Sequence, residues 1–344
     1  MSWYIREIQP QDCSRWDGFV LGHPHGSPFH LLAWKKSIEE TFHFEPHYLV
    51  AEDDTGIHGV LPLFLVQNLI VGKALISSPF AVYGGILADS ERVRQSLHDE
   101  ARKLGEKSGV GYVELRNAYA EQCVGVPNVS RYVTFTCSVE PDEKKSLESL
   151  PKKTRNMVRK ALKYPYVTRR HGSDFRAFEE LYAKNMRRLG TPSFPKKHFS
   201  ALLSNFGSMV DIQETVLDGK VVAASLNFYF RDQMHTYYAA SDPSYNDKAP
   251  NNYMYFDHLR HAALQGYAVF DFGRCKRETG VFEFKRHWNT TMRELPYEVL
   301  LINRKEVPNF SPVNPRFEMA IAIWKKLPLL ITRALGPAFV RLFP

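Results

Sequence analysis

Apolar and polar positions along this chain form two similar series of segments. In the first half the pattern predicts a strand, two helices, a β-hairpin, a further apolar strand, a long charged helix and a last strand. The helix before the hairpin shows its apolar residues, among them Leu31, Trp34 and Ile38, at near-helical spacing. The predicted segments are 3–8 before the short opening helix, and 29–42, 46–52, 57–67, 69–76, 90–108 and 112–116 after it.

The second half repeats this order of elements. Two predicted helices are followed by a hairpin across Asp218-Gly219, a strand, a helix and a buried strand. The predicted segments are 175–189, 198–205, 211–217, 220–230, 235–240, 252–265 and 268–272. Element order alone therefore indicates an internal duplication without sequence identity. A length of 344 residues accommodates two domains, which we expect at 1–143 and 144–305, with a tail at 306–344.

The net charge of +8 is concentrated in two stretches. Residues 144–171 carry ten lysines and arginines and one acid, and residues 310–344 carry five and one. Local positive charge indicates a polyanionic partner. In the first stretch Lys152, Arg155, Arg159 and Lys163 step by three or four residues, so they share a face of a predicted helix. This face either binds an anion or is a solvated basic surface.

The tail alternates short apolar runs with basic residues around Trp324. Each run is shorter than the roughly 20 residues that span a bilayer. Two interpretations stay open, an interfacial membrane anchor or a helix packed on the body. The chain begins without an apolar signal region, so we expect a cytoplasmic protein, peripheral to the inner membrane in the first case. Four scattered cysteines without metal spacing predict reduced thiols and no metal site.

The candidate chemistry is positional, because no Gly-rich phosphate loop, zinc signature or nucleophile motif occurs. The strand pair at 220–240 can splay and expose backbone N–H groups to an acyl carbonyl. Lys285 lies among Phe282, Phe284 and Trp288. It either neutralises a developing negative charge or is a structural lysine whose head reaches water. The paired glycines after Tyr83 allow a close backbone approach or a tight bend.

Several of these stretches resemble the FemABX family, the peptidoglycan interpeptide-bridge aminoacyltransferases. The resemblance rests on Pro250-Asn251 at a helix start, on Asp271-Phe272-Gly273 and on the run from Gly280 to Trp288. Trp34 after Phe29-His30 and the basic helix fit as well, so the likeness covers about residues 20–300. The segment Pro79-Phe80 to Gly84-Gly85 and the tail are similar to FemAB-like proteins associated with exosortase/PEP-CTERM systems.

The resemblance implies an α/β fold of two tandem GNAT-like acyltransferase domains, each a mixed, largely antiparallel sheet flanked by helices. It also implies transfer of an aminoacyl group from aminoacyl-tRNA to an amine of a nucleotide- or lipid-linked cell-envelope precursor, without a tightly bound cofactor. Lys285 matches the family's functional lysine, and Arg155 lies where the family contacts the acceptor's phosphates. We expect further substrate contacts from Arg159, Trp34, Tyr83, Tyr238 and Asn251.

Three departures from the family keep other functions open. Ile38 stands where the family has a first-domain lysine, Tyr83-Gly84-Gly85 replaces Arg-Gly-Pro, and no coiled-coil arm for tRNA occurs. An acyl-CoA donor with an amino-sugar or exopolysaccharide acceptor is therefore an alternative. A non-catalytic membrane-surface scaffold and an RNA-binding protein without transfer activity are two more.

Overall fold

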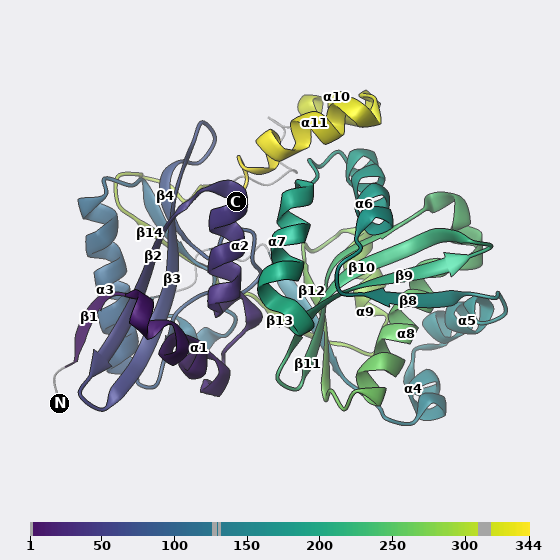
Figure 1. Cartoon of the computed structure of the whole chain (residues 1–344), viewed down its shortest axis with the longest axis horizontal. Coiled ribbons are helices and arrows are strands. Elements are labelled where there is room, and N and C mark those ends of the chain that lie inside the picture. Colours follow the sequence, from purple (N-terminus) through teal and green to yellow (C-terminus); the bar gives the residue numbers. More distant parts are fainter. Residues whose placement is uncertain (1–2, 126–128, 130–131, 309–317) are drawn as a thin grey trace. The chain divides into compact units, whose positions relative to one another are not determined.

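The computed structural model describes residues 3–125, 129, 132–308 and 318–344, which form two compact units. Of these residues, the first unit takes those up to 132, together with 294–308 and 338–344. The second unit takes 133–293 and 318–337. Each unit is built on one mixed sheet with helices on both faces (Figure 1).

The sheet of the first unit has the strand order β1-β2-β3-β4-β6-β14, with the short β5 beside β3. Its neighbours are antiparallel except β4 and β6, which are parallel and joined through α3. Asp53 shapes the β2–β3 turn by accepting hydrogen bonds from the backbone and hydroxyl of Thr55. The strands are β1 Tyr4–Glu7, β2 Glu45–Asp53, β3 Gly56–Asn68, β4 Gly72–Ser77, β5 Leu87–Ala88, β6 Tyr112–Leu115 and β14 Glu298–Leu301.

Helices α1 (Cys13–Gly22) and α2 (Leu32–Phe42) cover one face of this sheet, and α3 (Glu91–Lys107) covers the other (Figure 1). Helix α3 begins where the Ser90 hydroxyl accepts a hydrogen bond from the backbone N–H of Val93. Its apolar stripe packs on the sheet through Val93, Leu97 and Ala101. On the α1 side, the Trp16 ring lies 5.0 Å from that of Tyr48. Strand alternation thus supplies a core on both faces.

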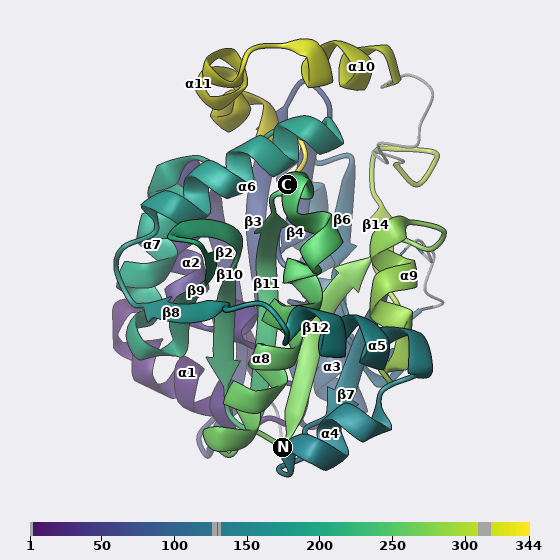
Figure 2. The same cartoon turned by 90° about the vertical axis from the view of Figure 1, so that its right-hand side faces the viewer.

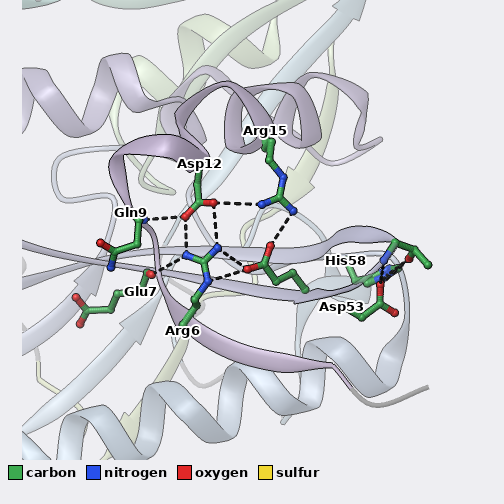
Figure 3. A network of polar contacts seen from close by, with 9 residues as sticks. Arg6, Glu7, Gln9, Asp12, Arg15, Asp53 and His58 are labelled. Atoms are coloured by element: carbon green, nitrogen blue, oxygen red, sulfur yellow. Dashed lines mark hydrogen bonds and ion pairs between the residues drawn. The ribbon is translucent and has the colours of Figure 1, made fainter.

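An ion network around two buried acids ties β1 to α1 and β2 (Figure 3). Arg6 donates to both carboxylate oxygens of Asp12, at 2.5 and 2.9 Å, and also contacts Glu52. Arg15 bridges the same two acids at 3.2 and 2.7 Å. The hydrogen bonds from Arg6 lower the pKa of Asp12 to about 2. Both acids therefore stay ionised, and the network fixes the first strand.

The sheet of the second unit has the order β8-β9-β10-β11-β12-β7-β13. Strands β11 and β12 are the parallel pair, and helix α8 connects them. The hairpin predicted across 218–219 is present, and a second hairpin across 231–232 joins β10 to β11. The strands are β7 Val133–Ser138, β8 Val167–His171, β9 Val210–Leu217, β10 Lys220–Phe230, β11 Gln233–Ser241, β12 Val269–Cys275 and β13 Thr291–Glu294.

Helices also cover both faces of this second sheet. On one face, α6 (Arg176–Leu189) and α7 (Lys196–Phe206) pack aromatic rings around Tyr238. On the other, α5 (Lys152–Ala161), α8 (Pro250–Leu264) and α9 (Gly280–Arg286) form a core with Phe270 and Phe272. The basic stretch is two helices rather than one, because Pro151 separates α4 (Glu143–Ser149) from α5.

The two sheets share one topology, which supports the predicted duplication. In chain order, β1, β2, β3, β4 and β6 correspond to β8, β9, β10, β11 and β12. The sixth strand of each sheet comes from the other half of the chain. Strand β7, which follows these five strands of the first sheet, pairs with β12 in the second sheet, and β14, near the end of the chain, pairs with β6 in the first. The contiguous boundaries expected at 143 and 305 therefore differ from the units, since a strand pattern does not show which sheet receives a strand.

Most of the described tail, residues 318–337, belongs to the second unit, whereas residues 306–308 and 338–344 belong to the first. Helices α10 (Glu318–Lys326) and α11 (Leu329–Val340) lie beside α6 in both views (Figures 1 and 2). Residues 309–317 of the predicted tail lie outside the described residues. Among the helices that are described, none has the length and apolar content needed to cross a bilayer.

Candidate functional site

The parallel strands of the second unit part in the middle of the sheet. Their ladder contains three pairs and ends at His235 and Asp271, although β11 continues to Ser241 and β12 to Cys275. Each strand carries a β-bulge at this level. On β11, Tyr237 has no partner residue on β10, and on β12 the two residues Phe272 and Gly273 lie opposite a single residue of β7. Beyond the last pair, the facing backbone groups of the two strands do not pair with each other.

Gly273 makes the bulge on β12 possible. Its φ of 75° lies in the left-handed region that favours glycine. A Cβ atom there would lie 3.3 Å from the carbonyl oxygen of Thr236 and 3.8 Å from Lys285 Nζ. The absence of a side chain on Gly273 therefore lets the β12 backbone, the Thr236 carbonyl and the Lys285 ammonium lie close together where the strands part.

Lys285 is the charged group at this point. Its ammonium donates to the carbonyl oxygens of Gly273 at 2.9 Å and Arg274 at 3.3 Å, and the residue is only 5% exposed. An ammonium has three N–H donors, so these carbonyls leave one for a substrate oxygen. Burial lowers the pKa of Lys285 to about 8, while Cys275 and Asp271 act in the opposite direction. The structural alternative required the ammonium of Lys285 to reach water, but the residue is buried.

Helix α9 holds this lysine in place. The hydroxyl of Thr279 caps the helix by accepting a hydrogen bond from the Phe282 backbone N–H. Phe282 packs on Phe135 with ring centres 5.3 Å apart, and Trp288 is 1% exposed in the same core. Aromatic packing therefore fixes the backbone on both sides of Lys285, which keeps its position rigid.

A buried histidine and aspartate end the ladder beside the lysine. His235 Nδ1 lies 3.3 Å from a carboxylate oxygen of Asp271, whose other oxygen accepts from Gly273 N–H at 2.6 Å and from Thr134. Among the described residues, His235 Nε2 has no hydrogen-bond partner. We did not expect a role for this pair, because only the parallel register brings positions 235 and 271 together.

Tyr238 and Asn251 are placed near the same strands but have structural contacts. The Tyr238 hydroxyl hydrogen-bonds with His198 at 2.9 Å, and burial raises the pKa of Tyr238 well above its ordinary value. Asn251 donates from its amide to the Ser241 hydroxyl at 2.9 Å, which ties the start of α8 to the end of β11. The substrate contacts predicted for both residues therefore stay predictions.

Arg155 and Arg159 lie one turn apart on α5, as the spacing predicts. Arg155 is half-buried and donates to the carbonyl oxygen of Glu148 at 2.9 Å, whereas Arg159 is exposed. Thr154 joins α5 to α9 through a 2.5 Å hydrogen bond to the His287 carbonyl. The basic helix and the lysine helix are thus connected within one unit.

Trp34 and Tyr83 come together in the first unit. Both rings contact Phe29, with ring centres 4.9 and 6.1 Å from it, and Trp34 is fully buried. The glycines after Tyr83 form a close backbone approach, because a Cβ on Gly85 would lie 1.9 Å from the Asn117 side chain. His30 also reaches the carbonyl oxygen of Gly85 at 3.0 Å. These residues build the core of that unit.

The connection between β11 and α8 bears on the acyl donor. Residues 242–250 contain no glycine and two aspartates, Asp242 and Asp247, against one lysine. Asp242 accepts hydrogen bonds from the backbone and hydroxyl of Ser244 within this connection. A pyrophosphate needs open backbone N–H groups and positive charge at a helix N-terminus. The acidic balance of the connection is unfavourable for the pyrophosphate of CoA, although no described side chain caps the N-terminus of α8. In the described part of the chain, no cluster of side chains could hold a metal ion.

Comparisons with known proteins agree with this architecture. The acetyltransferase (GNAT) domain family matches residues 149–286, which include α5, β12 and Lys285. The lipid II:glycine glycyltransferases of two Staphylococcus epidermidis strains are each 26% identical over 128 residues. That stretch is 35% of this chain and spans only 31% of the length of each relative.

Solved structures match the fold of most of the chain. The crystal structure of FemX covers 92% of this chain and 100% of its own, at a TM-score of 0.69 and 15% identity. A tandem GNAT protein from the clavulanic acid biosynthesis pathway covers 87% and 98%, at a TM-score of 0.51 and 9% identity. The chain therefore has the predicted fold of two tandem GNAT-like domains, each a mixed sheet flanked by helices.

Proposed function

We propose that this chain is an acyltransferase that moves an aminoacyl group from aminoacyl-tRNA to an amine of a cell-envelope precursor. The observation that carries the proposal is Lys285, buried where β11 and β12 part, with one N–H donor that no described residue accepts. Attack of an amine on an ester carbonyl places negative charge on the carbonyl oxygen. A buried, fixed ammonium stabilises that charge more strongly than water does.

The reaction balances without a covalent enzyme intermediate or a tightly bound cofactor. The acceptor amine forms a new C–N bond to the acyl carbon, the ester C–O bond breaks, and the tRNA ribose hydroxyl leaves with the proton of the amine. Holding the two reactants in line is the larger part of such catalysis. In this chain Lys285 stabilises the oxyanion, and the open edges of β11 and β12 position the carbonyl.

The acceptor proposed is a phosphate-bearing precursor, either lipid-linked or nucleotide-linked. Arg155 and Arg159 support it, because they supply cations on a helix joined to α9. Lipid II as acceptor of the similar glycyltransferases points to the same class. A lipid-linked acceptor would bring the enzyme to the cytoplasmic face of a membrane. The resemblance to exosortase-associated proteins makes an exopolysaccharide precursor the first alternative to test.

Mass spectrometry of the acceptor tests the proposal. The full chain is incubated with a pool of charged tRNA and with lipid-linked or nucleotide-linked muropeptide, and parallel reactions use acetyl-CoA with amino sugars. We expect the muropeptide to gain the mass of an amino-acid residue. An acetylated amino sugar would replace the proposed donor and acceptor, and no product from either mixture would support the scaffold or RNA-binding alternative.

A further inference from the structure

Helices α10 and α11 bury Trp324 and Val340 but leave several other large apolar side chains exposed. On α11, Leu330 is 81% exposed, whereas the small residues Thr332 and Gly336 face the body. A surface helix usually does the reverse and buries its large apolar stripe. We define the outward face by its exposed large residues: Met319, Ile323, Leu330, Ile331 and Leu335.

The other side of the two helices is firmly attached to the second unit, so the exposure is not a result of loose packing. Arg333 forms an ion pair with the buried Glu179 at 2.6 Å. Arg187 donates to the carbonyl oxygen of Leu327 at 2.5 Å. A Cβ on Gly336 would come within 2.9 Å of Ser193, which shows how closely α11 approaches the body. The attachment fixes which face points outward.

Two cations accompany the outward face. Lys325 and Lys326 are exposed at the end of α10, although the stem of Lys325 passes beside Gly190 of the body. Neither lysine forms an ion pair with a described residue. The only acid in residues 318–337 is Glu318, and Arg333 is occupied by Glu179. A helix of 12 residues is about 18 Å long, shorter than the roughly 30 Å hydrocarbon core. An apolar face of this length with basic neighbours suits the surface of a bilayer.

We propose that the outward face docks on a bilayer that contains anionic phospholipid. The large apolar side chains enter the boundary between headgroups and acyl chains, and Lys325 and Lys326 contact the lipid phosphates. The sequence left two interpretations of the tail open, a membrane anchor or a helix packed on the body. The proposal combines them, because one side of the helices packs on the body while the other binds the membrane. The inference rests on exposed side chains and is independent of the proposed reaction.

Flotation of the full chain with vesicles of phosphatidylglycerol and phosphatidylcholine tests the outward face. The double variant Leu330→Glu, Leu335→Glu should lower the partition coefficient by roughly 100-fold, because burying one leucine is worth about tenfold or more. The matched control is Leu69→Glu, Leu264→Glu, which changes leucines that are 98% and 82% exposed elsewhere. Equal loss in both variants, or no vesicle binding by the wild type, would overturn the proposal.

The lipid charge is tested separately. Lys325→Ala and Lys326→Ala should each weaken binding about fivefold at low salt, and vesicles of phosphatidylcholine alone should bind less. Equal binding to both vesicle types would contradict the role of the lysines. Light scattering that finds a dimer, converted to a monomer by the leucine variant, would assign the face to a second copy of the chain instead. Transfer to a water-soluble acceptor should stay unchanged in the leucine variant, which separates this inference from the enzyme's chemistry.

Discussion

Replacement of Lys285 by methionine removes the buried charge while it keeps most of the side-chain volume. The ammonium is held between two carbonyl oxygens and is the charged donor where β11 and β12 part. Removal of one donor to a developing oxyanion lowers kcat by about 100- to 1000-fold. We therefore expect kcat/KM of Lys285→Met to fall at least about 100-fold, which corresponds to about 2.7 kcal/mol of transition-state stabilisation.

The pH dependence distinguishes a charge-stabilising lysine from a base. Because the pKa of Lys285 is lowered to about 8, roughly 90% of the side chains carry the charge at pH 7 and about 10% at pH 9. Wild-type kcat/KM should then fall as pH rises through about 8, and Lys285→Met should lack this limb. A limb that rises through pH 8 in the wild type and is absent in Lys285→Met would mean that the neutral amine of Lys285 acts as a base.

Stability measurements supply the control, since methionine leaves the carbonyl oxygens of Gly273 and Arg274 without their donor. Burial of the charge costs the native state about 3 kcal/mol below pH 8, from a pKa change of 10.5 to about 8. As pH rises from 8 to 10.5, the wild type should gain this amount relative to Lys285→Met. Ser225→Ala removes another buried hydrogen bond, 3.0 Å long to His258, without a charge. If Ser225→Ala lost activity equally, the charge argument would be refuted.

Three further substitutions give independent checks. Asp271→Asn should move the falling limb of activity to lower pH, because the Asp271 charge raises the pKa of Lys285. Arg159→Ala should weaken binding of a phosphate-bearing acceptor several-fold at low salt and less at high salt, as calorimetry would show. Arg6→Met should lower the free energy of unfolding at pH 7 by about 1 kcal/mol, because Arg6 is partly exposed and Arg15 keeps its pairs with both acids; denaturant titrations should show this difference shrinking as pH falls from about 4 toward the Asp12 pKa of about 2.

Much of the fold follows from the sequence, because its apolar patterns are regular. The period of each strand and helix predicts the elements, and their repeated order predicts the duplicated sheets. The exchange of β7 and β14 could not be predicted, since a short strand carries no signal for the sheet that it joins. The break at Pro151 was readable in principle, because proline disfavours a helical conformation at the residue before it.

The candidate site was predictable only in part. Lys285 stands out as a cation among aromatic residues, but its burial depends on the carbonyls of Gly273 and Arg274, which the sequence does not place. The partnership of His235 and Asp271 arises from parallel pairing across an intervening helix. For Tyr238 the sequence indicated a substrate contact, whereas in the structure its hydroxyl is hydrogen-bonded to the buried His198.

The most direct test of the central claim is transfer measured with two labelled donors in one reaction. Tritiated aminoacyl-tRNA and carbon-14 acetyl-CoA are offered together to the wild type and to Lys285→Met, with lipid-linked muropeptide as acceptor. The account predicts that only tritium enters the acceptor and that the Lys285→Met variant transfers at least about 100-fold less. Transfer of carbon-14, or equal tritium transfer by both proteins, would contradict it.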